Sequence, residues 1–212
     1  MHDTCPAILS RHEFEIATGV KNTDWQKLRL TLTSSKEDWE AGVTMFEKRV
    51  RRFLEPVRVL MMASEIEVRI YAGFAIMALD CLLVETLQSF RIGRSNPLKG
   101  NDGYSTQAFV DFLTQRDSFK RDFDSASALA FYRHFRCGIL HQGEVKSSGL
   151  IRIDIPRLVM PSVDGQSLVV NRRMFHEALL QEIDIYKKEL LEGDDVTLKR
   201  NFIKKMNEIS RV

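Results

Sequence analysis

The residues best suited to chemistry in this sequence are Arg136 and His141, which stand five positions apart in the segment FYRHFRCGILHQG (131–143). An arginine side chain stays protonated in proteins, whereas histidine titrates close to neutral pH. The pair therefore supplies a fixed positive charge beside a group that can accept or donate a proton. A reaction at a phosphodiester requires both, because the phosphate must be bound and protons must be moved.

The spacing of the two residues bears on how they can meet. On a regular α-helix, five residues turn the chain by about 500°, which leaves the two side chains roughly 140° apart in azimuth. Either the long arginine and a helix end weakened by Gly138 and Gly143 bring them together, or a second copy of the helix does. An antiparallel copy across a two-fold axis places Arg136 of one subunit near His141 of the other. The sequence therefore predicts a homodimer whose interface includes this helix.

Long helices must position this segment. The strongest helical pattern runs over residues 65–91 and carries a wide apolar stripe that belongs at the centre of a bundle. The stripe consists of Ile66, Ile70, Phe74, Met77, Cys81, Val84 and Leu87. An earlier helix begins after Ser35, with two acidic residues in its first turn, and its apolar face extends to Leu54. Pro56 is expected to kink or end that helix, because proline removes a backbone donor.

Shorter patterns account for the rest of the chain. The segment KLRLTLT (27–33) alternates between apolar and polar residues, which is typical of a half-buried strand. The glycine-containing polar run 94–103 is the clearest loop. Further helices are predicted at 104–115, from Asp124 or Ser125 to the Arg136–His141 segment, at 171–191 and at 197–209. The segments 150–155 and 167–171 alternate as strands on either side of a turn, which predicts a β-hairpin at about 149–171.

These patterns predict a mainly α protein. We expect one helical-bundle domain over residues 35–212 that carries the small β-hairpin. An N-terminal extension with one strand, residues 1–34, precedes it. With 212 residues, the chain is long enough to bury a sizeable core.

Composition narrows the function classes. A net charge of +2 gives no overall basic field, so contact with nucleic acid has to come from a local patch. The three cysteines lack metal-ligand spacing, and we expect neither a metal site nor a cofactor. The N-terminus has no signal-peptide pattern, and the most apolar stretch, 70–84, is interrupted by Asp80 and too short to span a bilayer. We therefore expect a cytoplasmic protein without a membrane partner.

An arginine and a histidine separated by a few residues at a helix end, in an all-helical domain, resemble the signature of the HEPN superfamily (higher eukaryote and prokaryote nucleotide-binding domain). The phrase FRCGILHQGE (135–144), followed by a hairpin and a helix that contains a tyrosine, looks particularly like bacterial members. The resemblance covers roughly residues 65–191. It implies a HEPN-like helical bundle that dimerises to form a composite cleft. For active members it also implies metal-independent RNA cleavage in toxin–antitoxin, antiphage or CRISPR-associated systems, with an antitoxin or defence protein as a partner.

The resemblance also assigns catalytic residues. Arg136 and His141 match the motif, and Glu85 occupies the place of an acidic or polar residue that family members carry on an earlier core helix. Cleavage through the 2′-hydroxyl of the RNA needs proton transfer, which His141 can perform, and a cation on the phosphate, which Arg136 can supply. Glu85 would then orient Arg136.

Further candidates for substrate binding are Arg133, His134 and Asp80. Arg133 and His134 extend the surface that would bind the phosphate, and Asp80 is an alternative to Glu85. If Asp80 is buried, it needs a partner, and a structural hydrogen bond explains it. Cys137 stands where many active members carry a polar residue.

The same residues allow other interpretations. Cations near a helix C-terminus stabilise it through the helix dipole, and Glu85 can be a solvated or salt-bridged residue. The basic cluster Lys48, Arg49, Arg51 and Arg52 is either a solvated face or a track for a phosphate backbone. The chain is therefore either a HEPN-like endoribonuclease or a non-catalytic HEPN-like module that binds a nucleotide, RNA or a protein. A third function, an antitoxin or regulatory subunit, would use the edge of the hairpin to bind its partner.

Overall fold

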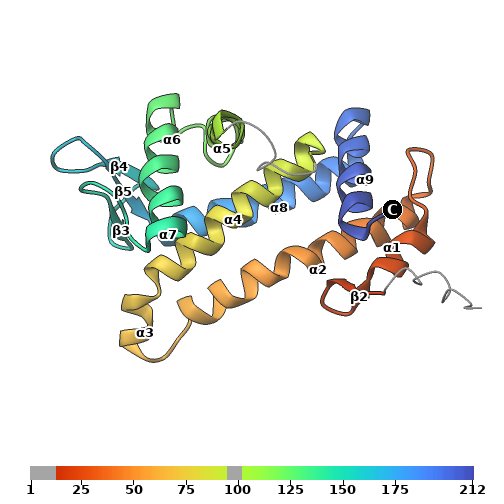
Figure 1. The fold of residues 1–212 in the computed structure, drawn as a ribbon, viewed down its shortest axis with the longest axis horizontal. Helices are drawn as coiled ribbons and strands as arrows, with labels where there is room; N and C mark the ends of the chain where they lie inside the picture. The colour runs from red at the N-terminus through yellow and green to blue at the C-terminus, as the bar shows by residue number, and fades with distance from the viewer. Residues whose placement is uncertain (1–12, 95–101) are drawn as a thin grey trace, which may run out of the picture.

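The computed structural model describes residues 13–94 and 102–212 of the chain (Figure 1). The helices are α1 (Asn22–Leu28), α2 (Lys36–Met61), α3 (Ile66–Tyr71), α4 (Gly73–Ile92), α5 (Asp102–Gln115), α6 (Ser125–Phe131), the π-helical turn η1 (Tyr132–Arg136), α7 (Cys137–Gln142), α8 (Arg172–Glu192) and α9 (Val196–Ser210). The strands are β1 (Glu15–Ala17), β2 (Val20–Lys21), β3 (Leu150–Arg152), β4 (Val159–Pro161) and β5 (Leu168–Asn171). The prediction of a mainly helical protein is confirmed. Residues 95–101 of the predicted loop lie outside the described residues.

Helix α4 lies at the centre of the molecule. Figure 1 shows α4 and α8 running through the middle with α2 beside them, while α6–α7 and α9 stand at opposite ends. Helix α4 contacts α2, α5, α7, α8 and α9. The second half of its predicted apolar stripe is buried, namely Met77, Cys81, Val84 and Leu87. The expectation of a central apolar helix is confirmed for these residues.

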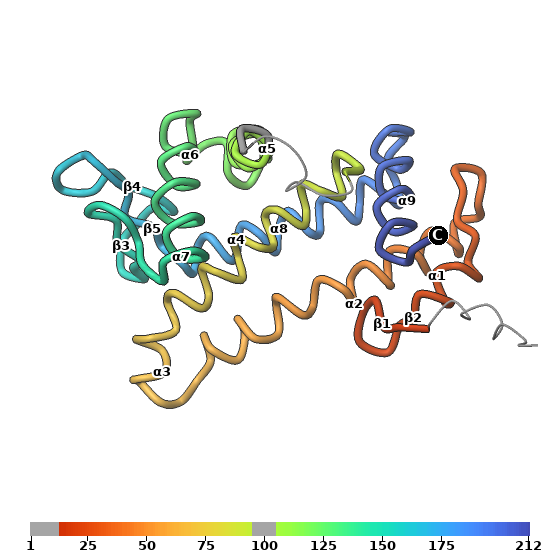
Figure 2. The backbone as a smooth tube through the Cα atoms, viewed as in Figure 1, coloured from red at the N-terminus to blue at the C-terminus, as the bar shows by residue number. Residues whose placement is uncertain are grey.

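The first half of the helix predicted at 65–91 differs from the observed structure. The chain breaks at Ala72 into α3 and α4, and the predicted core residues Ile66, Ile70 and Phe74 are 64%, 62% and 44% exposed. The prediction that they face the core is wrong. Figure 2 shows α3 at the turn where the chain reverses from α2 to α4. Its main contacts are with those two helices, and among the described residues its apolar side chains stay exposed.

Helix α2 begins where the sequence places it but extends further. The Ser35 hydroxyl accepts a hydrogen bond from the Asp38 amide at 3.2 Å, which caps the helix. Pro56 does not end it, because the helix continues to Met61. The neighbouring Val57 is fully buried against a small apolar cluster around Ile76. Packing of this turn offsets the hydrogen bond that proline removes. Of the two predicted outcomes, a kink or an end of the helix at Pro56, the end is wrong.

Two groups of aromatic side chains build the core. One group lies near α9 and contains Trp25, Trp39, Phe46, Phe90, Tyr186 and Phe202. The other lies around α5, α6 and α8 and contains Phe109, Phe112, Phe119, Phe123, Phe131, Phe135 and Phe175. Phe131 stacks on both Phe135 and Phe175, with ring centroids 5.0 Å apart in each pair. Because Phe131 and Phe135 precede Arg136 directly along the chain, this packing fixes the helix that carries the candidate chemistry.

The strand predicted at 27–33 is wrong. Helix α1 ends at Leu28, and the following residues pair with no strand. Leu28 and Leu30 pack over Gly42 of α2, where the missing Cβ leaves room for them. The alternating leucines therefore reflect packing on a helix. The N-terminal strands are instead β1 and β2, an antiparallel pair, and the indole of Trp25 donates to Asn207 at 2.7 Å, which joins this segment to α9.

The segment after α7 forms a three-stranded sheet in the order β3–β5–β4. Strands β4 and β5 are antiparallel, whereas β3 pairs with β5 in parallel, with Leu150 opposite Val169. The hairpin predicted between 150–155 and 167–171 is therefore wrong in its pairing. A parallel pair needs a crossover connection, and the intervening residues supply it while forming β4.

Among the described residues, α4 is the one helix long and apolar enough to cross a membrane. This helix extends beyond the apolar stretch 70–84, so the length of that stretch does not decide the question for α4. Inside the protein, however, 61% of that window is buried, as in the core helix of a bundle.

Candidate active site

Arg136 and His141 lie on one continuous helical run, α6–η1–α7. The carboxylate of Asp124 accepts a hydrogen bond from the Ser127 amide at 2.7 Å, which confirms the predicted start of this run. The run ends at Gly143, whose φ of 70° lies in the left-handed region that glycine adopts without strain. Between them, η1 is a π-helical turn, a rare element that often occurs at functional sites.

Three groups hold the Arg136 side chain. Its Nε donates to Oε1 of Glu85 at 2.6 Å, and its Nη1 lies 3.1 Å from Nε2 of His141. Its guanidinium carbon lies 5.5 Å from the centre of the Tyr132 ring, which is a cation–π contact. Glu85 therefore forms a salt bridge with Arg136, the contact that it needs in order to orient the guanidinium as predicted.

The hydrogen bond between Arg136 and His141 shows which imidazole nitrogen is the acceptor. Arginine can only donate, so Nε2 of His141 accepts, and the neutral ring carries its proton on Nδ1 in this arrangement. His141 is exposed, whereas Arg136 is only 7% exposed. A ligand arriving from solvent therefore meets the imidazole first and the guanidinium behind it.

Arg136 and His141 meet within one chain. Of the two alternatives, contact within one chain through the long arginine side chain is the one observed, and a second subunit is not needed to bring the two groups together. The arginine side chain is long enough to bridge the difference in azimuth, and His141 remains inside α7. The homodimer itself stays a prediction, because this contact does not require it.

Glu85 sets the electrostatics of Arg136. Burial alone would lower the pKa of the guanidinium, but the hydrogen bond and charge of Glu85 outweigh burial and raise the pKa above its ordinary value. The site therefore holds a permanent cation whose charge is balanced by one carboxylate.

Three other predicted residues lie outside this group. Asp80 is 1% exposed, and its Oδ1 accepts from Nδ1 of His176 at 2.8 Å, so its predicted structural hydrogen bond is confirmed and it does not reach a ligand. Nδ1 of His134 lies 3.0 Å from the hydroxyl of Ser167 and faces the sheet. Arg133 is exposed on the neighbouring turn.

No group of three His, Cys, Asp or Glu residues that could hold a metal ion occurs in residues 13–94 and 102–212. Cys81 is buried, and burial raises the pKa of its thiol well above the ordinary value. Cys137 is half-buried beside Arg136.

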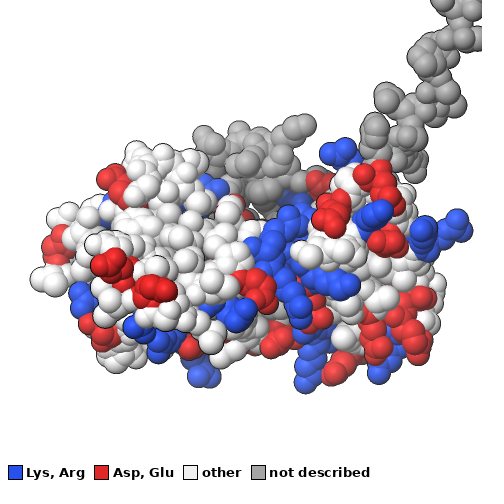
Figure 3. Space-filling view, turned by 90° about the horizontal axis from the view of Figure 1, so that it is seen from below, with Lys and Arg blue, Asp and Glu red and all other residues white. Residues whose placement is uncertain are grey.

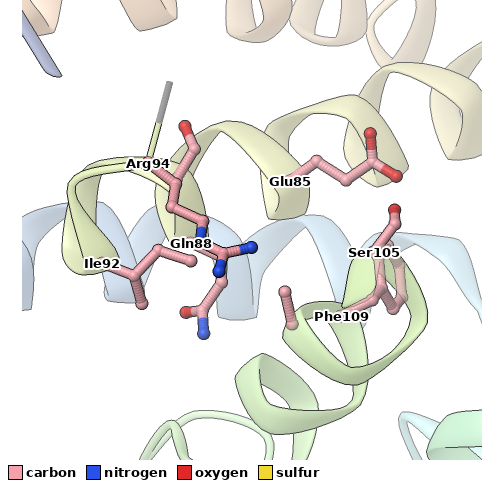
Figure 4. A pocket seen from close by; sticks show the side chains of 8 residues that line it. Glu85, Gln88, Ile92, Arg94, Ser105 and Phe109 are labelled. Carbon is pink, nitrogen blue, oxygen red and sulfur yellow. The ribbon is translucent and has the colours of Figure 1, made fainter. Parts of the chain in front are cut away.

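A small hollow between α4 and α5 adjoins the site (Figure 4). It is shallow and open to solvent, and its enclosed part has room for about one water molecule. Its lining consists of Glu85, Gln88, Ser89, Ile92, Arg94, Ser105, Ala108 and Phe109. Neither this hollow nor the contact of Tyr132 with Arg136 was predicted from the sequence. Residues 85, 88, 89 and 92 share one face of a helix. Glu85 and Gln88 are polar residues on that face that pair with no neighbour in the helix, and this was the available signal.

Two residues of the basic cluster predicted on α2 have a structural role. Figure 3 shows Lys and Arg side chains gathered over the middle of one face of the molecule. Arg49 and Arg52 both donate to the carbonyl oxygen of Ile16, at 2.6 and 3.0 Å, which holds β1 against α2. Burial lowers the pKa of Arg49 to about 10. Lys48 and Arg51 are exposed.

Comparison of this chain with protein-family models, with curated proteins and with solved structures finds no match. The candidate site therefore stands on its own geometry.

Proposed function

We propose that this protein is a HEPN-like, metal-independent endoribonuclease that cleaves RNA through attack of the 2′-hydroxyl. The single observation that carries the proposal is the position of Arg136. Its guanidinium lies between the Glu85 carboxylate at 2.6 Å and the exposed imidazole of His141 at 3.1 Å. This arrangement combines an oriented cation with a proton carrier at the protein surface.

In the proposed reaction, Glu85 holds Nε of Arg136 and leaves the terminal nitrogens for a phosphate. When the phosphate takes over Nη1, Nε2 of His141 is released and can accept the 2′-hydroxyl proton. The 2′-oxygen then bonds to phosphorus while the bond from phosphorus to the 5′-oxygen breaks. The leaving 5′-oxygen takes a proton, for which a second imidazole is suited. The products are a 2′,3′-cyclic phosphate and a free 5′-hydroxyl.

A homodimer is part of the proposal because it supplies that second imidazole. The described surface around α3 and the start of α4 exposes large apolar side chains, namely Val59, Met62, Ile66, Ile70, Tyr71, Phe74 and Leu82. Soluble proteins rarely leave a group of this kind uncovered. Leu82 lies one turn before Glu85 on α4, so a second copy seated on this surface would reach the site.

The setting that we propose is cytoplasmic, within a toxin–antitoxin or antiphage defence system. A ribonuclease that needs no metal cannot be held inactive by withholding one, so a cell that makes it needs an antitoxin or another defence protein to control it.

The test is cleavage of total RNA in the presence of EDTA. We expect wild type to cut and His141→Ala to lose at least about a hundredfold in rate, because general acid–base groups contribute factors of that order. His134→Ala is the matched control, since His134 faces Ser167 instead of the site. No cleavage of any RNA by wild type would exclude the proposal, and equal cleavage by His141→Ala would exclude this site.

A second candidate function is a non-catalytic HEPN-like module that binds a nucleotide, RNA or a protein. One observation favours it: the charge of Arg136 is already balanced by Glu85, and Nη1 is already occupied by His141. Such a module would bind RNA without cutting it, and His141→Ala would leave its affinity unchanged.

A further inference from the structure

Two arginine side chains of α2 converge on one carbonyl group of β1. Nη1 of Arg49 and Nη2 of Arg52 both donate to the carbonyl oxygen of Ile16, at 2.6 and 3.0 Å. The two positive charges therefore lie side by side, and within residues 13–94 and 102–212 neither of them forms a salt bridge with a carboxylate. Charges that are drawn away from water are usually paired in proteins, so this arrangement points to an anionic ligand.

The ionisation of Arg49 reflects the same lack of a counter-charge. Burial, and after it the charge of Arg52, lower the pKa of Arg49 to about 10, and no carboxylate in the described chain opposes them. Arg136 is the opposite case, because Glu85 raises the pKa of its guanidinium above the ordinary value. Arg49 is still a cation at neutral pH, and an anion bound beside it would relieve its repulsion by Arg52.

A depression that is open to solvent adjoins the two arginines. It lies between α2, β1 and the turn from β1 to β2, and solvent can enter about 210 Å³ of it. This is room for several water molecules and hence for a phosphate group. The residues that line it are Glu15, Ile16, Ala17, Thr18, Lys48 and Arg52.

The lining supplies hydrogen-bond donors and an excess of positive charge. Lys48 and Arg52 stand four positions apart, so they share one face of α2. Arg52 donates to two backbone oxygens through Nε and Nη2, which leaves its other N–H groups for a ligand. The Lys48 ammonium and the Thr18 hydroxyl make no hydrogen bond to a described residue. Glu15 is the one carboxylate of this lining, and its Oε1 accepts from the amide of Gly19 at 3.3 Å.

The depression belongs to a basic face of the molecule. Helix α2 runs along the lower side of the protein in Figure 1, and Figure 3, seen from that side, shows Lys and Arg side chains across the middle. A single carboxylate would leave most of this charge unbalanced, whereas a polynucleotide brings a negative charge with every nucleotide. Guanidinium groups also match the geometry of phosphate oxygens. An extended strand of phosphodiesters therefore fits this open, basic surface.

We propose that the depression between β1 and α2 binds a backbone phosphate of an RNA strand, with Lys48, Arg52 and the Thr18 hydroxyl in contact with the phosphate and Arg49 behind them. That the strand is RNA rests on the proposed function, whereas the binding of a phosphodiester rests on the contacts described here. Contacts to phosphate carry no information about the base, so this site would add affinity for RNA without sequence preference.

The experiment measures the affinity of the full-length chain for a short single-stranded RNA by fluorescence anisotropy, at a series of salt concentrations. Every 2′-hydroxyl of the RNA is methylated, so that it cannot be cut. We expect Lys48→Gln to weaken binding at least threefold at low salt. The slope of log affinity against log salt should become shallower by about 0.7, the value for one phosphate contact on a single strand.

Two variants control for charge and for position. Lys48→Arg keeps the positive charge, and we expect it to bind with the affinity and salt slope of wild type. Lys36→Gln is the matched control, because Lys36 lies at the start of the same helix, is exposed and pairs with Glu40. We expect its salt slope to equal that of wild type.

Two further probes separate the sources of negative charge. At the same ionic strength, we expect an oligoglutamate of equal charge and inorganic phosphate each to bind wild type at least tenfold more weakly than the RNA. Oligoglutamate binding as tight as that of RNA, and equally sensitive to Lys48→Gln, would assign the depression to an acidic protein. Saturable binding of inorganic phosphate that Lys48→Gln abolishes, with unchanged affinity for RNA, would assign it to free phosphate. Either result would overturn the proposal.

The outcomes also separate this inference from the proposed function. No binding of the RNA by wild type, or equal salt slopes for wild type, Lys48→Gln and Lys36→Gln, would overturn the inference. Lys48-dependent binding by a chain that cleaves no RNA would keep the inference and reject the nuclease. Cleavage that depends on His141, by a chain whose affinity for RNA does not depend on Lys48, would do the reverse.

Discussion

The Glu85 carboxylate binds Nε of Arg136 at 2.6 Å, although the two residues are 51 positions apart in the chain. Their side chains are 17% and 9% exposed, so the pair is shielded from most of the solvent. Binding through Nε fixes the plane of the guanidinium and leaves its terminal nitrogens for other partners. Glu85 thus acts as a positioning residue for the candidate site.

Replacing Glu85 by glutamine should reduce activity more than stability. Glu85→Gln keeps the shape of the side chain but removes the charge that orients Arg136, and we expect a loss of tenfold or more in RNA cleavage. The free energy of unfolding should fall by no more than roughly 1.5–3 kcal/mol, the range for a hydrogen bond to a charged group. Glu47→Gln is the control, because it breaks the salt bridge to Lys187 between α2 and α8, away from the site. A fall in stability without a fall in activity would show that Glu85 is only structural.

The ring of Tyr132 should matter more than its hydroxyl. Tyr132 is 9% exposed and lies under the Arg136 guanidinium, so Tyr132→Phe keeps the cation–π contact whereas Tyr132→Leu removes it. We expect cleavage by Tyr132→Phe close to that of wild type and a several-fold lower rate for Tyr132→Leu. The two rates would be measured on the same RNA. Similar rates for both variants would mean that the contact does not position Arg136.

The buried pair of Asp80 and His176 should give stability a measurable pH dependence. Burial raises the pKa of Asp80, partly opposed by the hydrogen bond from His176, and Oδ2 has no hydrogen-bond partner among the described residues. The folded protein therefore binds the Asp80 proton more tightly than the unfolded chain does. The contribution of Asp80 to stability is fully present below the unfolded pKa near 3.8 and is lost as pH rises through the raised folded pKa.

Asp80→Asn removes this titration and keeps an oxygen that can accept from His176. The stability of Asp80→Asn minus that of wild type should therefore rise as pH increases from below 3.8. Urea denaturation at a series of pH values measures this difference. Asp184→Asn, on the exposed face of α8, controls for the loss of a negative charge. A difference that stays flat or falls with pH would contradict the prediction.

The exposed apolar surface around α3 should mediate dimer formation. Phe74→Glu places a charge on that surface, and we expect it to produce a folded monomer while wild type is a dimer in light scattering after size exclusion. Val163→Glu is the control, because Val163 is fully exposed on the turn before β5. A wild-type chain that stays monomeric on concentration would refute the homodimer.

The sequence predicted the features that depend on neighbouring residues. Asp124 caps its helix through the amide three positions later. Asn171 caps α8, because its side chain accepts from the amides of Arg173 and Met174. The contact between Glu85 and Arg136 was also predictable, because a central helix must pack beside the helix that carries the arginine. These predictions follow from the spacing of residues along a helix and from the rule that apolar helix faces are buried.

The wrong predictions concern features set by distant residues. The alternation of Leu28 and Leu30 looks like a strand, but the space over Gly42 decides where these side chains go. Nothing local shows that Ile66 and Ile70 are uncovered, because that depends on where the other helices end. The parallel pairing of β3 with β5 likewise depends on a third strand inserted between them in the sequence.

The π-helical turn at Tyr132–Arg136 has a consequence for variation in chain length. A π-turn holds one residue more than an α-turn, so it corresponds to a single-residue insertion in an otherwise regular helix. The wider turn takes up the extra residue locally, so the residues after it keep nearly the azimuth that a regular α-helix one residue shorter would give them. If the same residues formed a regular α-turn without a deletion, everything after the turn would rotate by about 100°, and His141 would face away from Glu85 although every side chain of the site would still be present. The alignment of this site is thus encoded in a residue count as well as in residue identity.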